Sequence, residues 1–288
     1  MIPHYAVDGD GPPLLLLNSL GTTLDMWRPQ ITPLGARFCL VRYDTRGHGG
    51  TPFASGGGSG RAGRGGDGHG QVGGDSTGDD ATGDDPGPGR LTIDDLAGDA
   101  IDLLDHLGIE RAHVAGVSLG GAVAMRLAVT RPERVDRLVL VSTAAKLGTP
   151  EGWRERADIV RANGTAAISE AAMGRWFSPA FISGHPDTVA EFRRRFDACD
   201  DDGYAACCEA LGAMDQRDDV HRITAPALIV GGTADEVTTP ADAAFLDERI
   251  PDSRMLLAEG AKHLPTAERP DRCNRLLTEF LEEDHDDD

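Results

Sequence analysis

Ser118 lies in a sequence pattern that can turn a serine hydroxyl into a nucleophile. An apolar run, 113–117, leads into Gly-x-Ser-x-Gly, and small and apolar residues then follow at a spacing typical of a helix. A serine on so tight a strand-to-helix turn takes strained backbone angles, and Gly116 and Gly120 leave out side chains that would collide with neighbouring backbone. The turn pushes the hydroxyl into the open, where it could attack a carbonyl carbon. The alternative interpretation is a plain turn serine.

A serine hydroxyl needs a base, and the base needs a carboxylate that orients it. Asp235 follows one apolar run, and His263 follows the next run along the chain. If these runs are neighbouring parallel strands, the loops at their carboxyl ends lie together. We therefore predict Ser118 as the nucleophile, His263 as the general base and Asp235 as the orienting carboxylate. Glu236 is the alternative to Asp235.

Backbone amides in two loops could stabilise the oxyanion that forms when a serine attacks a carbonyl. The amide of Leu119 begins the helix after Ser118, where helix amides carry partial positive charge. The amide of Leu20 lies in the loop 18–22, after the first strong apolar run; an ordinary glycine-containing turn is the alternative there. An acyl-enzyme would form, and water would then hydrolyse it. This chemistry requires no metal and no organic cofactor.

Six short apolar runs bounded by turn residues predict buried parallel strands. They span 14–18, 38–43, 113–117, 138–142, 227–230 and 254–257. Helical patterns separate several of them, and one such pattern begins at the capping residue Thr92 and ends at Gly108. Alternating strands and helices predict an α/β fold, with a mostly parallel sheet flanked by helices.

Two segments depart from this alternation. Residues 55–90 are dominated by Gly, Asp and Ser, which predicts a disordered insertion because such a composition buries too little surface to offset chain entropy. Residues 145–220 carry helical patterns without strand patterns. These helical patterns span 153–162, 166–176 and 187–198. We predict a helical cap there, over the carboxyl edge of the sheet, and a core formed by 1–144 and 221–288.

Composition limits the location and the partners of the protein. The chain has 288 residues and a formal net charge of −20, which argues against nucleic acid or an anionic membrane as a partner. No apolar run approaches the roughly 20 residues of a membrane span, and the first residues do not resemble a signal peptide, so we predict a cytoplasmic protein. The five cysteines have no metal-binding spacing and are predicted to be free thiols. The sequence leaves a homo-oligomer open.

Four stretches of the sequence carry a family resemblance. They are Asn18–Thr22 followed by Met26-Trp27, Tyr43–Gly49, Gly116–Gly121 and Arg175–Phe181. Together they resemble the 3-oxoadipate enol-lactonases, which have the α/β-hydrolase fold with a helical cap. The second and third stretches are shared by many α/β-hydrolases, whereas the first and last are more specific. The resemblance covers nearly the whole chain outside 55–90, and that insertion departs from the family pattern.

The resemblance implies a substrate and residues that would bind it. The substrate would be a five-membered enol-lactone with an acetate arm, hydrolysed to 3-oxoadipate in the β-ketoadipate pathway of aromatic-compound breakdown. A carboxylated substrate should meet a cation, for which Arg175 is the candidate. Trp176 and Tyr204 could line the pocket. Solvation at the surface for Arg175, and packing in the core for the two aromatic residues, are the alternative roles.

Two other functions stay open. A carboxylesterase, or a cofactor-free haloperoxidase-like hydrolase, would use the same triad and would differ only in its cap and pocket. A non-catalytic hydrolase-fold receptor is a further alternative, against which the presence of all three triad residues argues. A preference for simple aryl esters over the enol-lactone would favour the esterase.

Overall fold

The protein is built on one seven-stranded sheet. A computed structural model describes residues 1–53 and 90–283. The strand order is β1-β3-β2-β4-β5-β6-β7, with β1 antiparallel to β3 and every other neighbouring pair parallel. The strands are β1 Tyr5–Asp8, β2 Pro13–Leu17, β3 Cys39–Tyr43, β4 Ala112–Val117, β5 Val135–Val141, β6 Ala227–Gly232 and β7 Ser253–Ala258.

The six strands expected from apolar runs are β2 to β7, with ends that differ by at most three residues from the sequence prediction. The side chains of these strands are largely buried: Leu14, Leu15 and Leu16 of β2 are all 0 % exposed. Because helices cover both faces of a parallel sheet, side chains on both faces of each strand are buried, and the sequence of the strand is continuously apolar. The exception is β1, an edge strand whose residues are half-buried or exposed, and the sequence analysis did not predict it.

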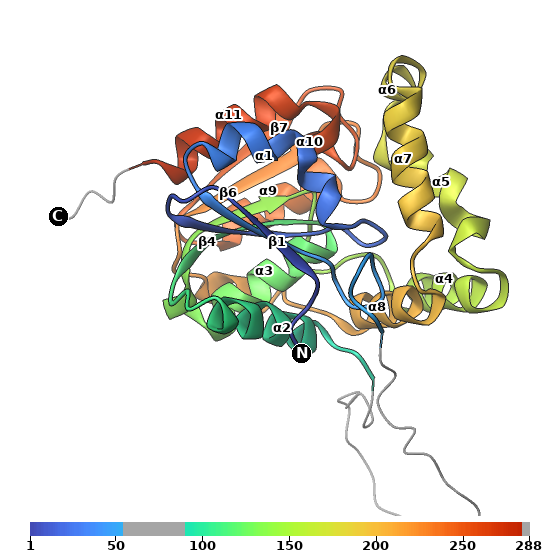
Figure 1. The fold of residues 1–288 in the computed structure, drawn as a ribbon, viewed down its shortest axis with the longest axis horizontal. Helices are drawn as coiled ribbons and strands as arrows, with labels where there is room; N and C mark the ends of the chain where they lie inside the picture. The colour runs from blue at the N-terminus through green and yellow to red at the C-terminus, as the bar shows by residue number, and fades with distance from the viewer. Residues whose placement is uncertain (54–89, 284–288) are drawn as a thin grey trace, which may run out of the picture.

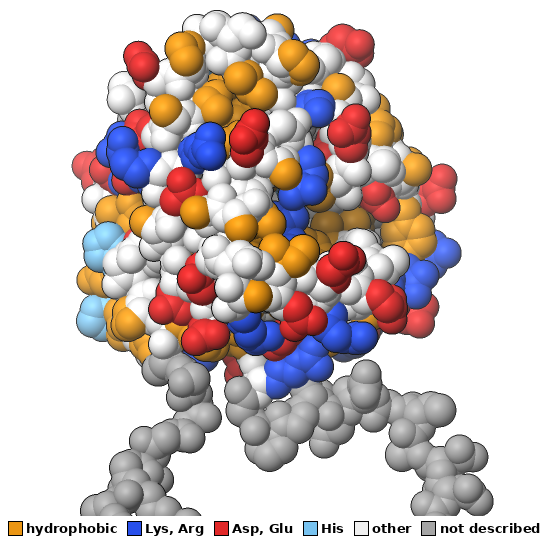
Figure 2. Space-filling model, turned by 90° about the vertical axis from the view of Figure 1, so that its right-hand side faces the viewer, with side chains coloured by type: hydrophobic (Ala, Val, Ile, Leu, Met, Phe, Trp, Pro, Cys, Tyr) orange, Lys and Arg blue, Asp and Glu red, His pale blue; other side chains and the backbone are white. Residues whose placement is uncertain are grey.

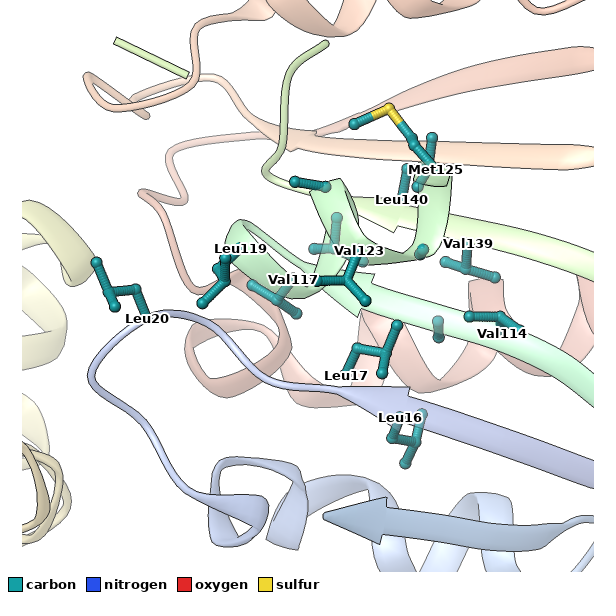
Figure 3. Packing of buried hydrophobic residues seen from close by; sticks show 14 of the residues in the cluster. Leu16, Leu17, Leu20, Val114, Val117, Leu119, Val123, Met125, Val139 and Leu140 are labelled. Carbon is teal, nitrogen blue, oxygen red and sulfur yellow. The ribbon is translucent and has the colours of Figure 1, made fainter. Parts of the chain in front are cut away.

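Helices pack on both faces of the sheet (Figure 1). On one face, α1 contacts α11; on the other, α2 contacts α3. The helices of this core are α1 Arg28–Gly35, α2 Ile93–His106, α3 Leu119–Thr130, α9 Pro240–Arg249, α10 Pro265–Glu268 and α11 Pro270–Leu281. Around β4, Val114 and Val117 of the strand and Val123 of α3 fill the space beside Leu17 of β2 (Figure 3).

Helix α2 begins where its sequence predicts. The Thr92 hydroxyl accepts a hydrogen bond from the Asp95 amide at 3.1 Å, and the Asp95 carboxylate accepts one from the Thr92 amide at 2.8 Å. These reciprocal bonds satisfy amides that have no partner within the helix. At the other end, Gly108 takes a positive φ of 68°, which glycine adopts without the steric cost of a Cβ.

Five helices, which we call the cap helices, follow β5 and precede β6. They are α4 Pro150–Asn163, α5 Ser169–Trp176, α6 Pro179–Gly184, α7 Pro186–Asp197 and α8 Asp201–Ala213. They form the right-hand side of the molecule in Figure 1. The three helical patterns predicted between 153 and 198 correspond to α4, α5 with the short 3-10 turn Thr165–Ile168 before it, and α7. Two cap helices, α6 and α8, were not predicted.

Three further predictions concern the insertion, membrane spans and the cysteines. The proposed insertion 55–90 lies, apart from Arg90, outside the described residues. None of the helices within 1–53 and 90–283 is both long and apolar enough to span a membrane. All five cysteines are free thiols, as predicted, and four of them are buried.

Candidate active site

Ser118 sits between the end of β4 and the start of α3 in a strained conformation. Its φ is 56° and its ψ is −112°, a region that residues with a Cβ rarely occupy and that is held only where the surroundings enforce it. A Cβ on Gly116 would lie 2.2 Å from the Gly120 carbonyl oxygen, and one on Gly120 would lie 2.3 Å from the Leu17 carbonyl oxygen. The glycines of Gly-x-Ser-x-Gly are therefore required by the close approach of strand, turn and helix.

Asp235 and His263 lie in the loops after β6 and β7, which are neighbouring parallel strands. His263 Nδ1 and Asp235 Oδ2 are 2.8 Å apart, and the two residues are 2 % and 4 % exposed. The carboxylate is fixed from its other side, because Oδ1 accepts hydrogen bonds from the amides of Val237 and Thr238. An imidazole that donates its Nδ1 proton to a carboxylate keeps Nε2 as a proton acceptor.

The ionisation of Asp235 follows from these contacts. Burial raises the pKa of this carboxyl group, but hydrogen bonds from His263, Thr238 and Val237 and the nearby histidine together lower it below its ordinary value. The alternative carboxylate, Glu236, points elsewhere: its side chain is 73 % exposed and lies 3.5 Å from Lys262 Nζ. The structure thus places Asp235, and not Glu236, against His263.

The three loops all lie at the carboxyl edge of the parallel strands. Ser118 follows β4, Asp235 follows β6 and His263 follows β7. The Ser118 hydroxyl makes no hydrogen bond within residues 1–53 and 90–283, including none to His263. Catalytic hydrogen bonds of this kind are often long until a substrate is bound and tighten in the reacting complex. The arrangement supplies an alcohol, an imidazole and a carboxylate in the order that acyl transfer uses.

Two backbone amides near Ser118 donate no hydrogen bond to the described part of the chain. Leu119 is the first residue of α3, so its amide has no intrahelical acceptor. In the loop after β2, the amides of Ser19 and Gly21 are bound by Met26 Sδ and His48 Nε2, whereas that of Leu20 has no partner there. Figure 3 shows Leu20 and Leu119 beyond the same ends of the parallel strands.

The cap reaches the His263 loop through α5. The Leu264 amide donates a hydrogen bond to the Trp176 carbonyl at 3.2 Å, and Lys262 Nζ donates one to the Gly174 carbonyl at 2.9 Å. Arg175 lies between these two contacts and is half-buried. Its neighbour Trp176 is 5 % exposed. The structure therefore places the backbone of these two residues beside the His263 loop, and their contact with substrate stays a prediction.

Tyr204 of α8 lies against the loop that carries Leu20. A Cβ on Gly21 would come within 3.2 Å of the Tyr204 ring. The side chain is 0 % exposed, and its hydroxyl accepts a hydrogen bond from Arg156 Nε at 2.8 Å. The structure gives Tyr204 a packing role beside the loop, and its contact with substrate stays a prediction.

Two residues near the site, His48 and Arg156, were not predicted from the sequence. His48 belongs to the stretch Tyr43–Gly49, which was noted for its resemblance without a role being assigned. Arg156 has no motif around it, and only the fold brings it to Tyr204. Figure 2 shows the face formed by the cap, where hydrophobic side chains line a hollow with Lys or Arg side chains at its edge.

Comparisons with known proteins show the family to which the chain belongs. Residues 14–276 match the model of the alpha/beta hydrolase family. The chain is 37 % identical over 278 residues to 3-oxoadipate enol-lactonase 2 of Acinetobacter baylyi, covering 95 % of this chain and 91 % of that protein. It is 30 % identical over 287 residues to a putative carbamate hydrolase, RutD, of Azorhizobium caulinodans, covering 97 % and 95 %.

A solved structure extends the likeness to three dimensions. The crystal structure of the enol-lactonase from Burkholderia xenovorans LB400 superposes with a TM-score of 0.83 and 34 % identity, covering 97 % of this chain and 96 % of that one. The predicted fold, the predicted hydrolase and the resemblance to the enol-lactonases are thereby confirmed. The chain belongs to the alpha/beta hydrolase family.

Proposed function

We propose that the protein hydrolyses 3-oxoadipate enol-lactone to 3-oxoadipate, in the β-ketoadipate pathway. The observation that carries the proposal is the position of Arg175, a half-buried residue of α5 whose two chain neighbours accept hydrogen bonds from the residues on either side of His263. An ester hydrolase for neutral substrates has no need of a cation there, whereas a lactone with an acetate arm does. Likeness to enol-lactonases over nearly the whole chain supports the same conclusion.

The reaction begins with attack on the lactone carbonyl. His263 Nε2 takes the Ser118 proton while the serine oxygen bonds to the carbonyl carbon, and the resulting oxyanion accepts hydrogen bonds from the amides of Leu20 and Leu119. When the oxyanion collapses, the bond to the ring oxygen breaks and His263 returns the proton to that oxygen. The product of this step is an acyl-enzyme whose enol end becomes the ketone.

The second half-reaction releases the product. A water molecule gives a proton to His263 Nε2 and attacks the acyl carbon, and a second oxyanion forms against the same two amides. Its collapse breaks the bond to the Ser118 oxygen, which recovers the proton from His263. Asp235 stabilises the imidazolium at both stages, since its carboxylate lies 2.8 Å from Nδ1. The sum is one lactone and one water converted to one open-chain acid.

The charges of the cap support a carboxylated substrate. No carboxylate pairs with Arg175 or Arg156 among the residues that the structure describes. Burial lowers the pKa of the Arg175 guanidinium, and the nearby Arg156 lowers it further. Two cations close enough to repel each other, without an acidic partner, form a site that a substrate carboxylate would stabilise.

Aromatic residues supply the apolar side of the proposed pocket. Trp176 packs edge-to-face on Phe192 and Phe196, at ring distances of 6.3 and 5.5 Å. Tyr204 in turn packs on Phe196 at 5.3 Å and receives the Arg156 hydrogen bond. We propose that Trp176 lies against the lactone ring and that Tyr204 borders the pocket and holds Arg156 in place.

Turnover of the enol-lactone, measured beside simple aryl esters and a carbamate, tests the proposal. Progress curves for the purified protein should give a kcat/KM for the enol-lactone about 10- to 100-fold above the other substrates, the size that one well-placed charged contact can supply. A clear preference for the esters would make the protein a carboxylesterase or a haloperoxidase-like hydrolase. A preference for the carbamate would instead follow the likeness to RutD.

Replacing Arg175 by glutamine tests the binding of the carboxylate. A hydrogen bond to a charged group contributes about 1.5–3 kcal/mol, so kcat/KM for the enol-lactone should fall about 10- to 100-fold. For a neutral aryl ester the same substitution should change kcat/KM by less than about threefold, since that substrate has no charge to lose. Steady-state kinetics on both substrates measure the difference.

Arg161→Gln is the matched control, because Arg161 is an exposed cap arginine already paired with Glu209 at 2.5 Å. It should leave both substrates unaffected. Equal losses on both substrates in the Arg175 variant would show that Arg175 holds the cap together and does not bind the carboxylate.

The surroundings of the enzyme follow from composition. We propose a cytoplasmic enzyme whose partner is the small-molecule lactone, without nucleic acid or membrane partners, because a net charge of −20 repels phosphate-bearing surfaces.

A further inference from the structure

His48 joins two loops through both nitrogens of its ring. The residue follows β3 and is 1 % exposed. Its Nε2 accepts a hydrogen bond from the Gly21 amide at 3.0 Å, and its Nδ1 lies 3.0 Å from the Arg46 carbonyl oxygen. An amide can only donate and a carbonyl can only accept, so these partners require a neutral ring with the proton on Nδ1.

The loop held by this bond is the one that carries Leu20. Gly21 takes a φ of 79°, and a Cβ there would lie 2.5 Å from the Phe196 ring. The loop is therefore packed by α7 on one side and tied by His48 through its Gly21 amide. Because the Gly21 amide is occupied, the preceding amide of Leu20 is the one left free for an oxyanion.

We propose that neutral His48 is a positioning residue, which holds the Leu20 amide in place for the oxyanion and releases it when the ring is protonated. This inference rests on the proposed oxyanion role of Leu20. His48 touches no reacting atom and acts only through Gly21. Protonation would convert Nε2 into a donor facing the Gly21 amide, so the tie between the loops would be lost.

The groups facing His48 set the pH at which this happens. They are the carboxylates of Asp44, at the end of β3, and Asp200, before α8, together with the Tyr204 ring of α8 at 6.2 Å. Burial lowers the pKa of His48, while the Arg46 carbonyl and the two carboxylates raise it, and the net pKa lies below its ordinary value of 6.5. The hydrogen bond from the Gly21 amide to neutral His48 is therefore fully present above pH 6.5 and is lost as the pH falls through the lowered pKa of His48.

Two substitutions separate the hydrogen bond from the packing. In His48→Leu the side chain still fills space but cannot accept, whereas in His48→Gln the amide oxygen can accept from Gly21. Loss of an entire oxyanion donor costs about 100- to 1,000-fold in kcat, so misplacing one should lower kcat of His48→Leu about tenfold or more. KM should stay within about threefold, because the loss falls on the transition state, and His48→Gln should recover most of kcat.

His113→Leu is the matched control. His113 is also buried, at 7 % exposed, but it lies at the start of β4 beside Asp136, at the opposite end of the strand from Ser118. Thermal unfolding followed by circular dichroism gives the stability of each variant. The control should lose stability without losing kcat.

The pH profile of kcat supplies a readout that packing alone would not change. In the wild type His263 must be neutral to act as the base and His48 must be neutral for full activity, so the acid limb of log kcat should be steeper than unit slope over the pH range in which His48 is protonated. In His48→Gln only His263 remains, and the slope should be about 1.

Any of three results would overturn the inference: a wild-type kcat in folded His48→Leu, equal losses in the leucine and glutamine variants, or an acid limb of unit slope in the wild type. If His48→Leu does not fold, the wild-type and His48→Gln slopes decide. A Ser118→Ala variant that keeps its activity would instead contradict the proposed function, but it would not bear on the hydrogen bond between His48 and Gly21.

Discussion

Replacing Ser118 by alanine should lower kcat for the enol-lactone by about 10⁴-fold or more, because no other group can form the acyl-enzyme. The fold should survive, since the strained turn is enforced by the close contacts of Gly116 and Gly120 and not by the serine hydroxyl, which has no hydrogen bond within the described residues. Stopped-flow or steady-state assays measure the loss, and circular dichroism confirms the fold.

The matched control is Ser142→Ala. Ser142 also follows a strand and also has a positive φ, 44°, but its hydroxyl is buried without a hydrogen-bond partner within the described residues. A hydroxyl shielded in this way cannot reach a carbonyl, so kcat should stay within about threefold of the wild type. A Ser118 variant that keeps more than a few per cent of wild-type kcat would show that water is activated directly and that no acyl-enzyme forms.

Replacing Asp235 by asparagine should lower kcat by about 10⁴-fold by imposing the wrong tautomer on His263. The amides of Val237 and Thr238 donate to Oδ1, so the asparagine oxygen would occupy that position and its NH₂ group would face His263. His263 Nδ1 would then have to accept a hydrogen bond from this NH₂ group, so the proton of the neutral ring would move to Nε2. A protonated Nε2 cannot take the Ser118 proton.

Glu236→Gln is the control for this variant, and it should change kcat by less than about twofold, because Glu236 is exposed and meets only Lys262. Measurement of both variants across pH separates a loss of base strength from a loss of folding. The assignment fails if Glu236→Gln inactivates the enzyme while Asp235→Asn does not.

Most of the fold was predictable because a parallel sheet covered on both faces must be apolar along its length. The runs at Leu14–Leu17 and Ala227–Val230 could form little other than buried strands. Strand β1 escaped prediction because an edge strand with one neighbour needs no such run. Helix α8 escaped because its small apolar residues are buried on nearly all sides, which removes the periodicity of a helix with a polar face.

The candidate site was predictable where chemistry is tied to the end of a strand. Ser118, Asp235 and His263 each follow a strand, so the topology of the sheet fixes which loops meet. The contact of His48 with Gly21 could not be found in this way, because it joins loops 27 residues apart through one hydrogen bond. Arg156 likewise becomes noticeable only when the packing of α4 on α8 brings it to Tyr204.

Activation of Ser118 by His263 and Asp235 can be detected by labelling the native protein with a fluorophosphonate, because such probes react with activated serines. Mass spectrometry of the labelled peptides should show a single adduct, on Ser118, that forms more slowly in the presence of the enol-lactone and is lost in Asp235→Asn. No adduct, or an adduct on another serine, would show that these three residues do not act together.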